Sequence, residues 1–416
     1  MHTEAFVPAL AWALPFAGLL LSIAVLPLAA PHFWESNLRK LGVCALLGAP
    51  VLALYWRAHP TMLVHAASDY VSFIVLLGGL FVISGGVLLE GDLEATPRTN
   101  ATFLGFGALL ASFVGTTGAS MLLIRPLLQT NRERKHVAHT VVFFIFLVSN
   151  VGGCLTPLGD PPLFLGYLLG VPFTWTFRLF VPWLFTTTLV LAVYALWDRR
   201  AHAREARADL KRDFYEVRRL RVAGKENLAL LGGVLAAVAF LGAPWRELVI
   251  VGLSVLSYAR TDPGLRKANR FTFHPILEVA ALFAGIFVTM LPALDILRAR
   301  GTELGVRAPW HFFWATGALS SFLDNAPTYL TFLALAQGLG QPAEVVGVSH
   351  ATLVAISLGA VFMGANTYIG NGPNFMVRSI AEERGVKMPS FGGYMLYSFG
   401  VLVPVFLLVT LVFFRG

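Results

Sequence analysis

The chain has 416 residues, of which 56% are hydrophobic and only 13% are charged. A soluble globular domain carries about twice that share of charged residues, so the composition excludes an ordinary soluble protein and predicts a polytopic α-helical membrane protein. The net charge of +8 does not indicate nucleic-acid binding, because ten basic residues lie in the single segment 199–225, as is typical of cytoplasmic loops.

Apolar segments approach the length of about 20 residues that a spanning helix needs. We expect spanning helices at residues 9–29, 38–56, 70–90, 176–197, 226–243, 246–260, 274–294 and 393–414. No basic segment precedes the first of them, which favours a membrane helix over a cleaved signal peptide. The two cysteines lie in apolar segments and indicate neither a disulfide framework nor a metal site.

Two more hydrophobic segments, 137–170 and 347–378, are interrupted in their middle. The first contains SNVGGCLTPLGDPPLFLG at 149–166, and the second contains VFMGANTYIGNGPNFMVR at 361–378. A continuous helix does not tolerate this density of glycine and proline, so each helix must break. Broken backbone at membrane depth survives where it is buried in protein or lines a polar cavity, which is how secondary transporters build substrate sites.

Segments 102–128 and 311–337 are also interrupted halfway, by GTTG at 115–118 and by DNAP at 324–327. Each could be a kinked crossing helix or a re-entrant hairpin. If both are hairpins and the linker 199–225 is cytoplasmic, 23 basic residues lie inside and seven outside, with one left in the membrane. This excess satisfies the positive-inside rule and favours the hairpins. Both termini then lie outside.

The two halves of the chain show signs of an internal duplication. Gly153, Thr156 and Asp160 fall on Gly364, Thr367 and Asn371 at an offset of 211 residues. Residues 112–113 match 321–322 at an offset of 209, and residues 79–82 resemble 285–288 at an offset of 206. With five crossings in each half, the second repeat is inverted relative to the first.

The predicted fold is therefore an all-α polytopic membrane protein made of two inverted five-helix repeats, each with a re-entrant hairpin and a broken transmembrane helix. The first repeat covers residues 1–198 and the second covers 226–416. Residues 199–225 form a basic, solvated, partly helical cytoplasmic linker, which could also contact anionic lipid.

Two carboxylates, Asp160 and Asp324, lie at breaks where an isolated charge would be costly. Two carboxylates flanked by unwound backbone can hold Na⁺ or protons but not both at once, which is the physical basis of cation/proton exchange. Either residue could instead only cap a half-helix. Oxygen atoms of carboxylates, amides and hydroxyls suit a hard cation, so the candidate ion- or substrate-binding residues are Asp160, Asp324, Asn325, Thr116, Thr117, Asn150, Thr156, Gly159, Asn366, Thr367 and Asn371.

Two charged residues are candidate partners of this site. Arg125 lies within the first predicted hairpin and could neutralise a carboxylate or an anionic substrate, or simply extend to the cytoplasmic face. Glu278 lies one turn into the span 274–294 and could belong to a proton path or be an interfacial end charge.

The four interrupted stretches together resemble the ion transporter superfamily, over most of residues 70–400. This group includes NhaD-type sodium/proton antiporters, CitMHS-type citrate transporters, the arsenite permease ArsB and INDY-type dicarboxylate carriers. VSNVGGCLTPLGDPP resembles the NhaD/ArsB-type break, and LDNAPT at 323–328 is similar to a hairpin of the same branch. TTGASMLLIRPL looks like the first hairpin tip, without the asparagine that INDY-type carriers have there. The resemblance implies two inverted repeats and a mobile transport unit within a scaffold, often in a dimer.

The leading function hypothesis is a Na⁺(Li⁺)/H⁺ antiporter that works by alternating access, and the alternative is a citrate or dicarboxylate symporter driven by H⁺ or Na⁺. A channel is also compatible with the sequence, but inverted broken helices favour alternating access. An intramembrane enzyme is disfavoured, because the sequence has no H-E-x-x-H motif and no Gly-x-Gly-Asp motif. We expect no cofactor, a bacterial cytoplasmic (inner) membrane location, and a homodimer whose partners are the lipid bilayer and a small inorganic cation or carboxylate.

Overall fold

The computed structural model describes residues 6–340 and 344–415, and this part of the chain is mostly helical. Six helical segments in the described residues are long and apolar enough to cross a membrane, namely Leu10–Pro27, Asn37–Ala58, Pro60–Ser84, Phe173–His202, His274–Leu304 and Phe391–Phe413. Shorter apolar helices include Ala138–Cys154, Glu226–Phe240 and His350–Asn366. The prediction of an all-α polytopic membrane protein is confirmed at this level.

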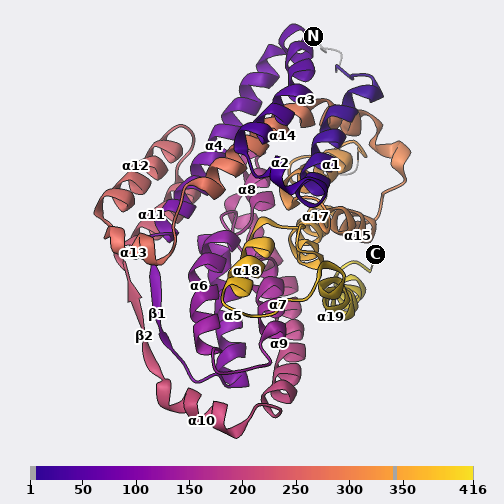
Figure 1. Cartoon of the computed structure of the whole chain (residues 1–416). Coiled ribbons are helices and arrows are strands. Elements are labelled where there is room, and N and C mark those ends of the chain that lie inside the picture. Colours follow the sequence, from indigo (N-terminus) through magenta and orange to yellow (C-terminus); the bar gives the residue numbers. More distant parts are fainter. Residues whose placement is uncertain (1–5, 341–343, 416) are drawn as a thin grey trace.

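The helices form two packed groups. The first helix group consists of α1 (Leu14–Ala29), α3 (Asn37–Ala58), α4 (Pro60–Ser84), α11 (Glu226–Phe240), α12 (Trp245–Arg260) and α14 (His274–Arg300). The second helix group consists of α5 (Pro97–Val114), α6 (Thr116–Thr130), α7 (Ala138–Leu147), α8 (Pro161–Leu168), α9 (Phe180–His202), α15 (Pro309–Ser320), α16 (Asn325–Gln337), α17 (His350–Met363), α18 (Gly372–Glu383) and α19 (Phe391–Phe413). Figure 1 shows α3, α4 and α14 of the first group in the upper part of the molecule and α5, α6, α7 and α9 of the second in the lower part. Helices α4 and α14 contact the second group through α6, α8 and α16.

Short helical elements complete the chain, namely η1 (Leu10–Ala13), α2 (Pro31–Trp34), η2 (Val151–Cys154), η3 (Phe173–Leu179), α10 (Arg207–Glu216), α13 (Pro263–Ala268), η4 (Gly301–Leu304) and η5 (Gly364–Asn366). The deepest part of the core is formed by α7 and α17, whose residues are almost all buried. Both of these helices lead directly into a break.

A two-stranded antiparallel ribbon, which was not predicted from the sequence, links the two helix groups. Strand β1 (Leu88–Asp92) pairs with β2 (Arg218–Ala223), with Leu88 opposite Ala223 and Asp92 opposite Arg218. The predicted span 70–90 is therefore wrong at both ends, since α4 covers Pro60–Ser84. Pro60 occupies the first turn of α4, where proline is tolerated, and Gly85 and Gly86 end the helix, because glycine is a poor helix former.

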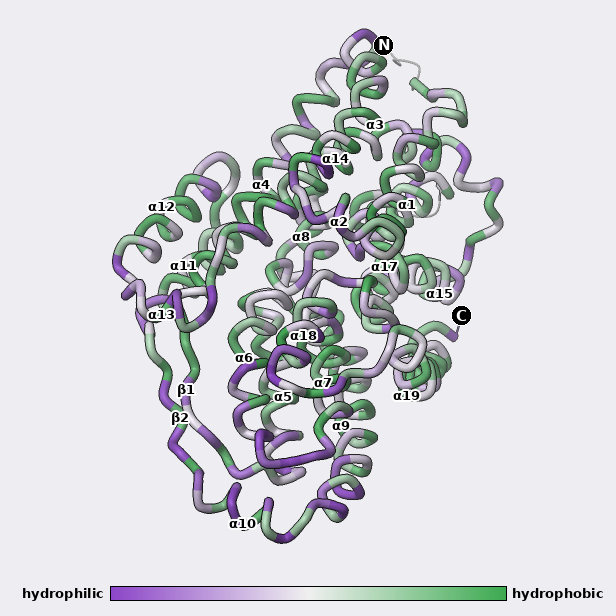
Figure 2. Tube along the Cα trace, in the orientation of Figure 1, coloured by the Kyte–Doolittle hydropathy of each residue, from purple (hydrophilic) through white to green (hydrophobic). Residues whose placement is uncertain are grey.

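Only part of the linker 199–225 is irregular coil. It contains the end of α9, the short helix α10 and strand β2, and Figure 2 shows its hydrophilic residues along the ribbon and α10. The buried side chain of Asp213 in α10 accepts a hydrogen bond from the backbone N–H of Ala95 at 2.9 Å, so the linker is docked on the segment that follows β1.

The segments predicted as interrupted are interrupted in the structure. Helix α5 ends at Val114, and Gly115 then adopts a φ of 82°, a left-handed conformation that favours glycine, before α6 begins. Helices α5 and α6 lie side by side (Figure 1). Helix α15 ends at Ser320, and α16 begins at Asn325 after Asp324.

Candidate functional site

The two broken helices have matching geometry at the start of their second halves. Asp160 precedes α8 with φ, ψ of −145°, 142°, and Asn371 precedes α18 with φ, ψ of −149°, 142°. A proline lies in the first turn of each following helix. The backbone conformation at the two positions is thus the same, although one residue is a carboxylic acid and the other an amide.

Two threonines form equivalent hydrogen bonds that join each break to a neighbouring helix pair, α5 with α6 or α15 with α16. The hydroxyl of Thr156 donates to the carbonyl of Ser112 at the end of α5, and the hydroxyl of Thr367 donates to the carbonyl of Ser321 at the end of α15. Each hydroxyl also accepts a backbone N–H two residues further along the chain. Thr156 and Thr367, both predicted as site residues, therefore bind backbone and shape the breaks.

Close backbone approach explains the glycines at the breaks. A Cβ atom on Gly159 would collide with the carbonyl oxygen of Gly153, and one on Gly370 would lie 2.5 Å from the carbonyl oxygen of Gly364. The carbonyl of Gly159 also accepts the backbone N–H of Thr116 at 2.8 Å, which joins the first break to the start of α6.

The carboxylate of Asp160 is the centre of a buried polar cluster. Its side chain is almost completely buried. Its Oδ1 accepts hydrogen bonds from the Thr116 hydroxyl at 2.8 Å and the Asn371 amide at 3.3 Å, and its Oδ2 accepts one from the Asn325 amide at 2.9 Å. Thr116 begins α6 and Asn325 begins α16, so residues from both breaks and both helix pairs meet at one carboxylate.

Two further asparagines hold this cluster in place. Asn150 accepts from the Asn371 amide at 3.3 Å and donates to the side-chain oxygen of Asn374 at 2.7 Å. Asn374 donates in turn to the carbonyls of Gly364 and Thr367. Asn374 was not among the residues predicted from the sequence, although it lies in the NGPN stretch of the second break, three residues after Asn371.

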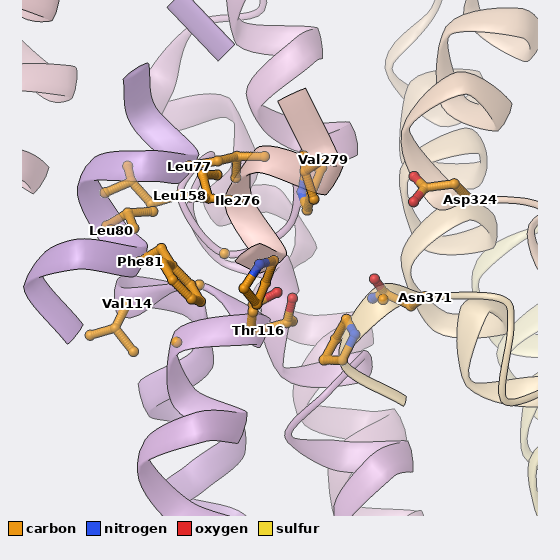
Figure 3. A pocket seen from close by; sticks show the side chains of 18 of the residues that line it. Leu77, Leu80, Phe81, Val114, Thr116, Leu158, Ile276, Val279, Asp324 and Asn371 are labelled. Carbon is orange, nitrogen blue, oxygen red and sulfur yellow. The ribbon is translucent and has the colours of Figure 1, made fainter. Parts of the chain in front are cut away.

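A cavity of about 120 Å³ lies against this cluster, between the two helix groups. Figure 3 shows Thr116, Asn371 and Asp324 around it, with apolar residues of α4 and α14 such as Leu80 and Ile276 on the other side. Thr117 and Gly159 also line it. None of the described residues that line the cavity is basic. Asp160 lies directly behind this wall, bonded to Thr116 and Asn371.

Asp324 both caps a helix and faces the cavity. One of its carboxylate oxygens accepts the backbone N–H of Ala326 at 3.0 Å, which satisfies a free donor at the start of α16. Among the described hydrogen bonds, none joins Asp324 directly to Asp160. The two acids are instead related through Asn325, which follows Asp324 and binds Asp160.

The remaining predicted residues lie away from the Asp160 carboxylate. The amide of Asn366 donates to the Ser321 hydroxyl at 2.9 Å, and its buried side-chain oxygen has no hydrogen-bond partner among the described residues. Arg125 has a buried guanidinium nitrogen without a hydrogen-bond partner and makes no ion pair within the described part of the chain. Glu278 forms an ion pair with Lys40 of α3.

The groups around Asp160 are all hydrogen-bond donors in this structure, namely one hydroxyl and two side-chain amides. The described residues contain no group of three or more histidine, cysteine, aspartate or glutamate side chains that could hold a metal ion. Carboxylate, amide and hydroxyl oxygens are the ligands that hard cations prefer.

Residues 5–414 match the protein-family model CitMHS_2, whose description is "Putative citrate transport". A search of curated proteins finds no match for the chain.

Proposed function

The chain belongs to the CitMHS_2 citrate-transport family, which matches nearly its whole length, and from that premise we propose that it is a cation-coupled secondary active transporter. The family is one of transporters, and the six long apolar helices agree with a multi-pass integral membrane protein. We place it in a bacterial cytoplasmic membrane. The buried carboxylate of Asp160, held by side chains from both breaks and both helix pairs, is the observation that carries this proposal.

Na⁺(Li⁺)/H⁺ exchange is the function that this geometry favours. Asp324 lines a cavity whose described lining has no basic residue, and Asp160 lies behind the same wall, so a cation is the charge that would lower the energy of both acids. Na⁺ would take the place of hydrogen-bond donors at Asp160, with the Thr116 hydroxyl oxygen and the Asn325 amide oxygen turned towards it. A proton on Asp160 would occupy the same oxygen atoms, so the two ions compete.

The matching contacts at Thr156 and Thr367, together with the shared backbone conformation at Asp160 and Asn371, support two inverted repeats in our proposal. In this arrangement, α5 with α6 and α15 with α16 are re-entrant hairpins whose tips reach the ion. Alternating access would follow from movement of the second helix group against the first, around a site at their boundary.

Citrate or dicarboxylate symport with H⁺ or Na⁺ is the second candidate, and two observations favour it. The first is the family match. The second is that Thr116, Pro161 and Gly372, the first residues of α6, α8 and α18, all line the cavity. Helix N-termini carry partial positive charge and bind carboxylates. A symported cation would offset the repulsion between the substrate and the two aspartates.

Reconstitution into liposomes that contain a pH-sensitive dye distinguishes these functions. We expect Na⁺ or Li⁺, but not K⁺, to cause proton movement in protein-containing vesicles and not in empty ones. If neither cation does so and radiolabelled citrate accumulates under a proton or Na⁺ gradient, symport replaces exchange. If no ion or carboxylate moves, the transport proposal fails.

A further inference from the structure

A second cavity, of about 600 Å³, lies at the C-terminal end of α9. It is bounded by the last turns of α9, by the start of α7 and by Tyr397 of α19. None of the residues that line it belongs to the Asp160 cluster, so the transport site does not account for it.

The α9 wall of this cavity changes from apolar to basic along its length. Val193, Leu196, Trp197 and Arg200 line the cavity at spacings of three or four residues, which places them on one face of α9. Arg204, in the turn that follows α9, also lines it. The apolar part is open to the surroundings, since Leu196 is 58% exposed and Trp197 is 38% exposed. The wall is therefore amphiphilic, with an apolar half followed by a cationic half.

The positive charge of the two arginines is not compensated. The ion pairs of the described residues include neither Arg200 nor Arg204. The nearby carboxylate of Asp198 is buried and bonded to Arg134 at 2.6 Å and to His139 at 2.9 Å. The cavity thus presents free guanidinium groups, because the acids around it are already engaged.

A second buried acid is engaged in the same way. The Glu205 carboxylate accepts hydrogen bonds from the backbone N–H groups of Lys135 and His136, at 3.1 and 2.9 Å. It is also within hydrogen-bond distance of the His136 ring, at 3.2 Å. Lys135 and His136 also line the cavity. The first turn of α7, a ten-residue helix, lines it as well and adds the partial positive charge of a helix N-terminus.

Aromatic rings give the cavity a rigid side. Trp197 stacks on Tyr397, with ring centroids 5.2 Å apart and planes 18° apart, and it lies parallel to His139 at 6.3 Å. Tryptophan and tyrosine are enriched where a membrane protein meets the headgroup region, because their rings have an apolar body and a polar edge. This end of α9 has the character of such an interface.

We propose that this cavity binds the phosphate headgroup of an anionic phospholipid, with Arg200 and Arg204 at the phosphate and an acyl chain along Leu196 and Trp197. A free phosphate ion shares the headgroup chemistry but would leave the apolar half of the wall unused. The lipid matches both halves, and basic residues at a membrane surface attract anionic lipids in this way. The proposal does not depend on which ion or substrate is transported.

The test uses the full chain in phosphatidylcholine nanodiscs, with increasing fractions of phosphatidylglycerol that carries bromine on its acyl chains near the headgroup. Bromine quenches nearby tryptophan, and subtraction of a Trp197→Phe sample isolates the signal of Trp197. Trp197→Tyr gives the same subtraction if the phenylalanine variant elutes as aggregate. The variant pair Arg200→Gln/Arg204→Gln is compared with Arg199→Gln/Arg207→Gln, which removes the same charge from the same segment outside the cavity lining.

We expect brominated phosphatidylglycerol to quench Trp197 at a lower mole fraction than brominated phosphatidylcholine, in wild type and in the control pair. In the Arg200/Arg204 pair, the fraction needed should rise about tenfold or more. Equal quenching by both lipids in wild type overturns the proposal, as does an equal loss in the two variant pairs. Displacement of the brominated lipid by millimolar inorganic phosphate would identify a soluble anion as the occupant and overturn the lipid assignment.

Discussion

The amide of Asn371 donates a hydrogen bond to the carboxylate of Asp160 at 3.3 Å, and the two residues occupy the same backbone position before their half-helices. The fold thus accepts either an acid or an amide at this position. A carboxylate is present on one side only, so the charge of Asp160 is not needed to form the break. This asymmetry points to a role for the charge in binding.

Asp160→Asn should abolish cation-driven proton movement while the protein remains folded. The amide keeps the shape of the side chain but carries neither charge nor a titratable proton. In wild type, the Na⁺ concentration for half-maximal exchange should rise as pH falls, because protons compete for the same oxygens. Liposomes loaded with a pH-sensitive dye measure both effects. The control is Glu303→Gln, which removes one negative charge at an exposed position.

Asp324→Asn should also strongly weaken exchange, by about tenfold or more, because it removes the acid that faces the cavity. Asparagine is a good N-cap residue, so α16 should keep its start. Wild-type exchange in both aspartate variants would make the two acids structural caps and would remove the main chemical support for the antiporter.

Gly370→Ala should impair transport, whereas Gly392→Ala, in α19 and outside both cavities, should not. The added Cβ at position 370 would lie 2.5 Å from the carbonyl oxygen of Gly364 and 2.8 Å from that of Ser320, so the break must shift. At position 392 the added Cβ meets no atom within 4 Å. Initial transport rates at matched expression give the comparison, and similar rates for the two variants would exclude a need for close packing at this break.

The topology prediction places residues 131–136 and 199–225 in the cytoplasm and residues 338–348 outside. Single cysteines introduced at Arg199, Arg218 and Glu344, in a background with Cys44→Ala and Cys154→Ala, should therefore label from opposite sides in oriented vesicles. Glu344→Cys should react with an impermeant maleimide only from the outer side. Reaction of that cysteine from the cytoplasmic side alone would contradict the hairpin formed by α15 and α16.

Arg134→Met should destabilise the protein by about 3–5 kcal/mol, because it leaves the buried charge of Asp198 without its main partner. Arg134 and Asp198 are buried and form two parallel hydrogen bonds, at 2.6 and 3.2 Å. Arg212→Gln removes an exposed ion pair with Glu216 and should leave the stability almost unchanged. Thermal unfolding in detergent compares the two, and an equal loss would mean that Asp198 is stabilised by His139 alone.

The breaks were predictable because glycine and proline act locally, so the positions of Gly153 and Pro161 already show where a helix cannot continue. Asp160 and Asp324 stood out for the same kind of reason, as acids in apolar surroundings. The partners of Asp160 were harder to find. Thr116 and Asn325 were named as candidates from their residue types, but that they reach one carboxylate from two different helix pairs follows only from the packing.

The ribbon could not be predicted from local pattern. Strand β1 has the sequence LLEGD, with an acid and a glycine in a run of five residues, and Gly91 adopts a φ of 138°. Its pairing depends on β2, which lies in the second part of a basic linker. Strand pairing of this kind is a long-range contact, and neither segment alone has the alternation that marks a strand.

The ribbon has a mechanical consequence for the two helix groups. Strand β1 connects α4 of the first group to α5 of the second, and β2 connects α10 to α11 of the first group. Two of the chain segments that link the groups are therefore hydrogen-bonded to each other. Sliding one strand along the other would break the register in which Leu88 faces Ala223, whereas bending both strands together keeps it. Displacement of the groups along the strands is thereby opposed, and tilting about an axis across the ribbon is the motion that its hydrogen bonds permit.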